Sequence, residues 1–76
     1  MAQIQITDHA IAEALARYDL LRFFKYEHLS QHLQLVSKQY SDLAYNMAVQ
    51  LPHCAETTVA LRKLLESKDA AVRSKL

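Results

Sequence analysis

The hydrophobic residues of this chain recur at helical spacing along three stretches. In the first stretch they step by four and then by three positions, which predicts one helix over residues 8–24. The members of this stripe are Ile11, Leu15, Tyr18, Leu21 and Phe24. Thr7 and Asp8 have side chains that can cap free backbone amides, so they predict the start of this helix.

The second stretch predicts a helix over residues 30–50. Its large apolar residues step by three or four positions, as in the seam of a coiled coil. They are Leu33, Val36, Tyr40, Leu43, Met47 and Leu51. Ser30 is expected to cap the start of this helix. Pro52 ends it because proline lacks a backbone N–H, and Ala44 and Ala48 beside the seam would allow another helix to approach closely.

The third stretch predicts a helix over residues 56–74. Glu56 suits the positive end of its dipole, and its apolar face consists of Leu61, Leu64, Leu65, Ala71, Val72 and Leu76. Residues 25–30 are expected to form a bent connection held by their aromatic residues, and residues 51–55 a short turn. The pattern therefore predicts a single all-α domain over residues 1–76, with an N-terminal helix followed by a long antiparallel two-helix hairpin.

Composition narrows the fold and indicates self-association. The chain has no glycine and one proline, so primed β-hairpin turns and glycine-rich phosphate loops are excluded. A chain of 76 residues is marginally stable alone, and a single cysteine cannot form an intramolecular disulfide. Four apolar residues lie off the main stripes, namely Leu20, Leu35, Tyr45 and Val59. We therefore expect further copies of the chain to cover them in a homo-oligomer.

Charge and hydropathy restrict the partners and the compartment. The formal net charge is only +1, whereas general nucleic-acid binders usually carry a basic surplus, so DNA is not expected as a partner. No apolar run reaches the roughly 18–20 residues of a membrane helix, and the N-terminal sequence does not resemble a signal peptide. The free thiol of Cys54 suits a reducing compartment. We expect a cytoplasmic protein that binds neither DNA nor membranes and needs no cofactor.

Two residue pairs could support catalysis or metal binding. His28 and His32 are four residues apart, which is a ligand spacing on a helix, but a zinc site usually needs three or four ligands. Cys54 follows His53, and a thiol beside an imidazole can act as a nucleophile and its base. The simpler interpretations are solvated or capping histidines and a cysteine packed in a turn. No pair of carboxylates indicates acid–base chemistry, and we expect no enzyme activity.

Phosphate binding has more support in the residues. Basic side chains recur along the last predicted helix, at Arg62, Lys63, Lys68 and Arg73. Thr57 and Thr58 stand at its start, where free backbone amides can bind anions. Lys25 lies between Phe24 and Tyr26, and a cation between aromatic rings can hold a phosphate beside a stacked base. The alternative is a solvated charged face and core aromatic residues.

Residues 24–73 also carry an ordered set of short motifs. These are Phe24-Lys-Tyr-Glu-His28, Asp42-Leu-Ala44, Leu51-Pro52, Glu56-Thr-Thr-Val-Ala-Leu61 and Leu64-Leu-Glu-Ser-Lys-Asp-Ala-Ala-Val-Arg73. In order and spacing the set resembles the phage anti-CBASS/Thoeris anti-defence hairpin-domain family. The chain departs from the family pattern at Glu27, which separates Tyr26 from His28, and in the length of its first helix.

The resemblance implies a function and a set of binding residues. Members of the family are sponges that bind cyclic nucleotide immune signals in the host bacterial cytoplasm without cleaving them, in pockets between the protomers of an oligomer that is often a hexamer. Tyr26 would stack on a base, Lys25 would lie near a phosphate, and Arg73 would close on the ligand. Thr57, Thr58 and Lys68 would be further contacts. The alternative is a small protein-interaction module or inhibitor whose seam on residues 33–43 docks a partner helix.

Overall fold

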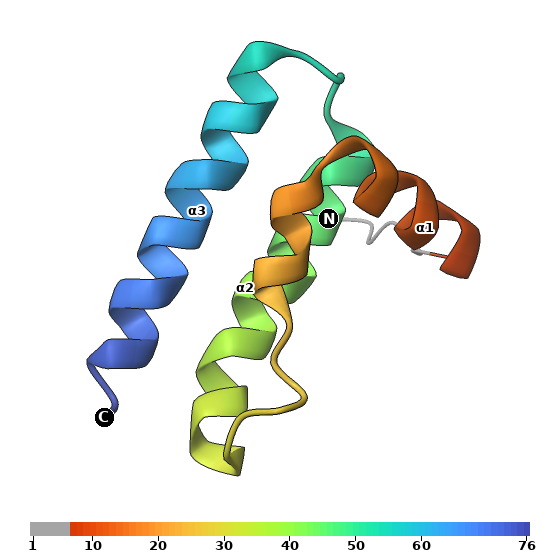
Figure 1. The fold of residues 1–76 in the computed structure, drawn as a ribbon. Coiled ribbons are helices and arrows are strands. Elements are labelled where there is room, and N and C mark those ends of the chain that lie inside the picture. Colours follow the sequence, from red (N-terminus) through yellow and green to blue (C-terminus); the bar gives the residue numbers. More distant parts are fainter. Residues whose placement is uncertain (1–6) are drawn as a thin grey trace, which may run out of the picture.

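The computed structural model describes residues 7–76, and the all-helical class that the sequence predicts is confirmed for this part of the chain. The elements in order are the helix α1 (Asp8–Arg17), the 3₁₀ helix η1 (Asp19–Phe24), and the helices α2 (Gln31–Gln50) and α3 (Ala55–Arg73). In Figure 1, α2 rises toward the short connection that follows it, and α3 descends from that connection beside α2. The 3₁₀ helix lies in front of α2 in this view and contacts both α2 and α3, and α1 crosses near the end of α2.

The prediction of one continuous helix over residues 8–24 is wrong, because the helix breaks at Tyr18. Thr7 caps α1 through its side-chain oxygen, which accepts a hydrogen bond from the N–H of Ala10 (3.1 Å). At Tyr18 the backbone is extended (φ −126°, ψ 90°), and the chain continues as η1. Tyr18, Leu21 and Phe24 are all buried and are spaced by three. Three residues is the period of a 3₁₀ helix, so η1 keeps Leu21 and Phe24 on the same side as Tyr18, which precedes it.

The buried face of α2 consists mostly of small residues, and Leu33 is the only buried member of the large-residue seam that the sequence pattern predicts. Its buried members are Leu33, Ser37, Ser41, Ala44 and Ala48. Leu43 and Leu51, which we expected in the seam, are 48% and 40% exposed. Small side chains allow the neighbouring backbones to approach closely, so η1 and α3 pack directly on this face. The predicted close approach at Ala44 and Ala48 is thus present. These alanines form the centre of the contact, whereas the sequence pattern placed them beside it.

The core joins all four elements and is small. Its buried apolar residues are Ala14, Tyr18, Leu21, Phe24, Ala44, Ala48 and Leu61. Three of the seven are alanines, so much of the volume comes from Phe24, Leu21 and Leu61, each fully buried. At the far edge of the α2–α3 contact, the hydroxyls of Tyr40 and Ser67 are 3.2 Å apart. Within residues 7–76, none of the helices combines the length and apolar character needed to cross a membrane.

Candidate functional site

Tyr26 lies in a well-anchored turn between η1 and α2. Its carbonyl accepts a hydrogen bond from the N–H of Leu29 (3.0 Å), and its own N–H donates to the Glu27 carboxylate (3.2 Å). The side-chain amide of Gln34 on α2 donates to the carbonyls of Glu27 (3.3 Å) and Leu29 (2.8 Å). The expected bend at 25–30 is therefore present, and an α2 amide holds it through hydrogen bonds. The Tyr26 ring remains half-buried.

The structure places a lysine near Tyr26 that the sequence interpretation missed. Lys38 of α2 forms an ion pair with Asp42 (2.8 Å), whose hydrogen bond and charge raise the pKa of the lysine ammonium. Gln34, which holds the turn after Tyr26, lies one helical turn before Lys38 and lines the same hollow, so Lys38 lies on the side of α2 that carries this turn. From the sequence alone, Lys38 would be expected only to form a solvated i,i+4 ion pair with Asp42. Nothing in the sequence indicates that it lies near the turn of Tyr26.

Lys25 and Lys68 are brought toward the same part of the molecule. Lys25 ends η1 and is exposed. The ammonium of Lys68, whose side chain is only 13% exposed, donates to the carbonyl of Phe23 (2.9 Å) and pairs with Asp69 (2.9 Å). Lys68 therefore joins α3 to the end of η1, two residues before Lys25. A cation at the C-terminal end of a helix also stabilises the helix, so Lys68 has a structural role whether or not it binds a ligand.

Arg73 lies near this end of α3 but on another side of it. It is exposed and is the last residue of α3, and it forms no ion pair with another residue in the described part of the chain. Five residues separate it from Lys68, which corresponds to about 140° around an α-helix and about 7.5 Å along it. Within one chain, Arg73 and Lys68 therefore leave α3 in different directions.

Thr57 and Thr58 lie at the opposite end of α3 from Arg73. The 16 positions between Thr57 and Arg73 correspond to about 24 Å along the helix. Thr57 is buried, and its hydroxyl donates to the carbonyl of Pro52 (2.6 Å). The Thr58 hydroxyl donates to the carbonyl of Cys54 (3.4 Å). In a single chain the two threonines hold the turn before α3, and they lie away from Lys25 and Tyr26.

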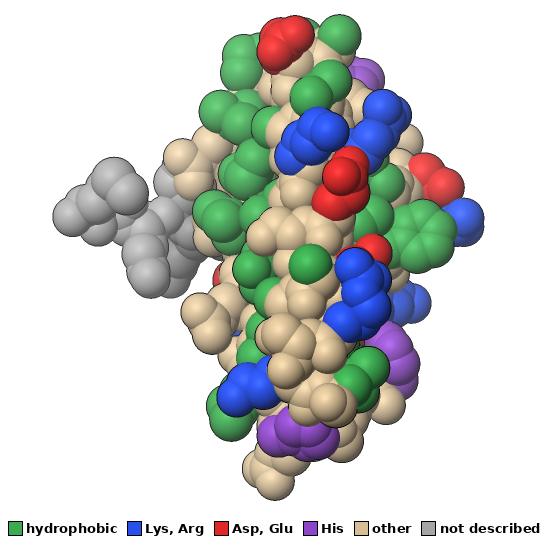
Figure 2. Space-filling view, turned by 90° about the vertical axis from the view of Figure 1, so that its left-hand side faces the viewer, with side chains coloured by type: hydrophobic (Ala, Val, Ile, Leu, Met, Phe, Trp, Pro, Cys, Tyr) green, Lys and Arg blue, Asp and Glu red, His purple; other side chains and the backbone are tan. Residues whose placement is uncertain are grey.

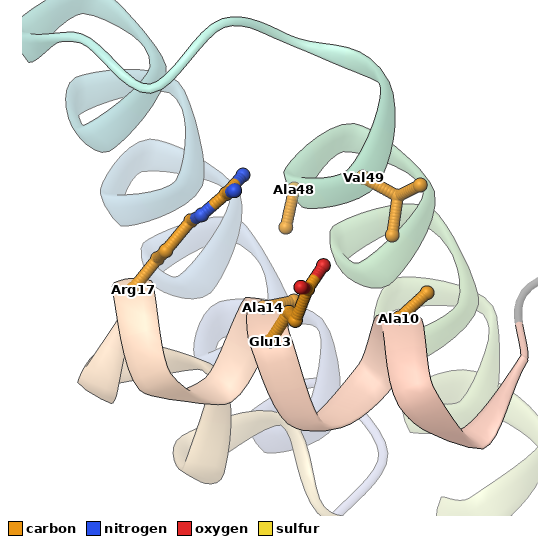
Figure 3. A pocket seen from close by; sticks show the side chains of 6 residues that line it. All are labelled: Ala10, Glu13, Ala14, Arg17, Ala48 and Val49. Carbon is orange, nitrogen blue, oxygen red and sulfur yellow. The ribbon is translucent and has the colours of Figure 1, made fainter.

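The described surface includes two hollows that lie on or beside α2. The larger, of about 260 Å³, is a shallow hollow on α2 lined by Gln31, Gln34, Leu35, Lys38, Gln39 and Asp42. The smaller, of about 60 Å³, lies between α1 and the end of α2 and is lined by Ala10, Glu13, Ala14, Arg17, Ala48 and Val49 (Figure 3). The smaller hollow has room for a few water molecules but not for a nucleotide. The larger one shares Gln34 and Lys38 with the surroundings of Tyr26.

The other candidate pairs are separated by their local structure. The Cys54 thiol is 3.5 Å from the hydroxyl of Thr57, and this hydrogen bond, together with the Thr57 backbone N–H, lowers the pKa of the thiol. The neighbouring His53 ring instead packs edge-on against Tyr18, with the ring centres 5.0 Å apart. His28 lies in the turn before α2, so helical spacing does not relate it to His32, whose ring is 3.2 Å from the Ser30 hydroxyl.

No cluster of three or more potential metal ligands occurs among residues 7–76. Comparisons of the chain with protein families, with curated proteins and with solved structures gave no match.

Proposed function

We propose that this chain sequesters a cyclic oligonucleotide signal without cleaving it, as a homo-oligomer in which the ligand lies between chains. The observation that carries the proposal is the position of Tyr26, an aromatic ring in a turn that Gln34 of α2 anchors, one helical turn before Lys38. An aromatic ring beside cations can stack on a base while the cations neutralise the phosphates. Lys25 and Lys68, at the same end of η1, add two further ammonium groups.

The geometry of one chain favours a ligand that contacts more than one chain. The α2 hollow, of about 260 Å³, is smaller than the roughly 300–1,000 Å³ of typical ligand pockets. Arg73 leaves α3 on another side than Lys68, and Thr57 and Thr58 lie at the far end of α3. A site that uses all the residues expected from the family resemblance must therefore take some of them from a second copy.

The biological setting in this proposal comes from the family resemblance. The helices α2 and α3 would form the hairpin of an anti-CBASS/Thoeris sponge, and we propose that six copies form a hexamer, as is usual in the family. The protein would act in the cytoplasm of an infected bacterium, where it would remove the cyclic nucleotide before the immune effector is triggered. Sequestration of the nucleotide requires residues that bind it and no catalytic group.

The test is a recovery experiment with a cyclic dinucleotide. The purified protein is mixed with cyclic GMP-AMP and filtered, free nucleotide is measured by chromatography, and the retained protein is denatured to release what it holds. Loss of free nucleotide and its intact return upon denaturation supports sequestration. Return of an altered product would identify an enzyme. If nothing is retained, cyclic trinucleotides and cyclic ADP-ribose isomers are tested next, and failure with all of them rejects the proposal.

Variants of Tyr26 test the site itself. Base stacking on an aromatic ring contributes roughly 1–3 kcal/mol, so we expect Tyr26→Ala to weaken binding about five- to 160-fold, and Tyr26→Phe to retain it. Arg73→Ala should also weaken binding, whereas Arg17→Ala, which removes an exposed arginine of α1, is the control. Normal binding by Tyr26→Ala and Arg73→Ala would show that the ligand binds elsewhere.

A second candidate function is a protein-interaction module or inhibitor without a nucleotide ligand. It is favoured by the exposure of Leu35 (71%) and Leu43 (48%) on α2, because large apolar side chains on one exposed face are typical of contact surfaces. This function predicts a complex with a different protein and no retention of any nucleotide. A Leu43→Asp variant should then lose the partner.

A further inference from the structure

One aromatic ring lies at the surface of the chain, and it belongs to Phe23 of η1. Among the phenylalanine and tyrosine residues at positions 7–76, Phe23 is the only exposed one, with 52% of its surface accessible. Its neighbours Leu21 and Phe24 are fully buried. Large apolar side chains are usually buried, so the exposed ring of Phe23 is available for contact with a ligand.

The exposed ring already holds a flat cation. The guanidinium carbon of Arg22 lies over the Phe23 ring, 5.0 Å from its centre, which is within the range of a cation–π interaction. Arg22 also pairs with Asp19 (3.4 Å), but both side chains are more than half exposed (58% and 80%), so this ion pair is weak. A planar base stacks on an aromatic ring much as a guanidinium does. A base on Phe23 would leave Arg22 beside it to exchange Asp19 for a phosphate.

The backbone that carries this ring is held in place. Leu21 and Phe24 fix η1 in the core, and the Lys68 ammonium donates a hydrogen bond to the carbonyl of Phe23 (2.9 Å). The Phe23 ring therefore projects from a fixed segment, and a ligand that stacks on it would need to order little of the chain. Lys25, two residues further on, is exposed and adds an ammonium group on the same segment.

The separation between Phe23 and Tyr26 suits a single ligand with two bases. The two residues are three positions apart, and three residues of chain extend over at most about 10–11 Å. Tyr26 is the ring that the proposed site uses for stacking on one base. A second base of the same molecule would therefore have an aromatic ring within its reach on the same short segment.

The charges favour a small nucleotide over a long nucleic acid as this ligand. On the face shown in Figure 2, basic side chains lie in separate places along α3, with acidic side chains between them. A polyanion would require a continuous basic surface, and the formal net charge is only +1. A cyclic oligonucleotide carries few phosphates, which two neighbouring cations such as Arg22 and Lys25 can neutralise.

We infer that Phe23 is a second base-stacking residue of the proposed nucleotide site, with Arg22 beside its ring as a phosphate contact. This inference rests on the proposed function and extends it. In one bound cyclic dinucleotide, Tyr26 and Phe23 stack on different bases, while Arg22 and Lys25 neutralise phosphates.

The experiment measures binding to the full chain by titration calorimetry, with cyclic GMP-AMP or the cyclic nucleotide that the recovery experiment retains. Phe23→Ala should weaken binding about five- to 160-fold, which is the effect of losing one stacked base. Phe23→Leu keeps an apolar side chain without a ring and should be weakened almost as much, whereas Phe23→Tyr should bind normally. Leu15→Ala, at another exposed apolar residue (37%) on α1, is the matched control and should also bind normally.

A fluorescence measurement tests stacking directly. The chain contains no tryptophan, so Phe23→Trp provides a single indole ring at this position. The variant should retain binding, and its fluorescence should be quenched when a base stacks on the indole. Leu15→Trp is the control and should show no quenching. Because Phe23 is half exposed, its variants are expected to fold, and circular dichroism verifies their helices.

Three results would overturn the inference and leave the proposed function standing. They are normal binding by Phe23→Ala, equal binding by Phe23→Leu and Phe23→Tyr, and unchanged fluorescence of Phe23→Trp at saturating nucleotide. In each case the unsubstituted protein still binds the nucleotide. If the unsubstituted protein retains no nucleotide in the recovery experiment, the proposed function and this inference are both rejected.

Discussion

Tyr18 shows at the scale of a single residue how this fold departs from its sequence pattern. Its spacing from Ile11, Leu15 and Leu21 fits a continuous helix, yet its backbone is extended and ends α1. The break lets its ring reach the core (3% exposed) and pack against His53. Its hydroxyl is buried without a hydrogen-bond partner in the described part of the chain. The aromatic ring therefore stabilises the fold, while the hydroxyl adds a cost.

We expect Tyr18→Phe to leave the free energy of unfolding unchanged or to increase it by about 1 kcal/mol, because a buried polar group without a partner costs roughly 1–3 kcal/mol. Tyr18→Ala should instead lower it by about 3–5 kcal/mol, the usual cost of removing a large buried ring. Urea unfolding followed by circular dichroism measures both variants. A clear loss of stability in Tyr18→Phe would mean that the hydroxyl has a partner that stabilises the native chain.

At the scale of the element, α2 presents two apolar faces, and sequence alone does not rank them. By hydrophobicity alone, the face of α2 with large residues such as Leu43 would be expected in the core. Packing instead places the small residue Ala44 at the centre of the fold (0% exposed). The helix bounds of α2 and α3 lie within one residue of those that the pattern predicts, because Pro52 and Glu56 mark them locally. Ser30 occupies the N-cap position of α2, but the predicted capping hydrogen bond is absent, and its hydroxyl lies 3.2 Å from the His32 ring instead. Which face is buried depends on how closely η1 and α3 approach, and that is a tertiary property.

Ala44→Leu tests which face carries the core. We expect it to lower the free energy of unfolding by about 1–3 kcal/mol or more, because added methylene groups in a close-packed contact force backbone shifts. Ala70→Leu makes the same change at an exposed position of α3 and should stay within about 0.5 kcal/mol. Urea unfolding compares the two. Equal stability of both variants would contradict the close approach at Ala44.

At the scale of the molecule, the candidate site combines residues that the sequence predicts with residues that it does not. Tyr26 and Lys25 were expected from their motif, and the fold brings Lys68 near them through the carbonyl of Phe23. Lys38 and Gln34 were not expected, because their roles depend on how the 25–30 turn packs on α2. Thr57 and Thr58 lie far along α3, so the distribution of the predicted residues itself favours a site shared between chains.

An assembly of this kind makes stability depend on protein concentration, which gives a last prediction. If the folded chain is stable mainly as a dimer or a larger oligomer, mass action favours the native state at higher concentration. For a dimer, each tenfold rise in concentration should add about 1.4 kcal/mol per mole of dimer to the apparent free energy of unfolding. Thermal unfolding followed by circular dichroism should therefore show a midpoint that rises with concentration in the unsubstituted protein and in the control Leu76→Glu, at an exposed position near the C-terminus (84%). In Leu43→Glu the midpoint should be lower and independent of concentration, because a charge at this exposed leucine of α2 (48%) would disfavour the apolar contact between copies in the proposed homo-oligomer. A constant midpoint in the unsubstituted protein would mean that its small core suffices for a monomer and that the exposed leucines serve another partner.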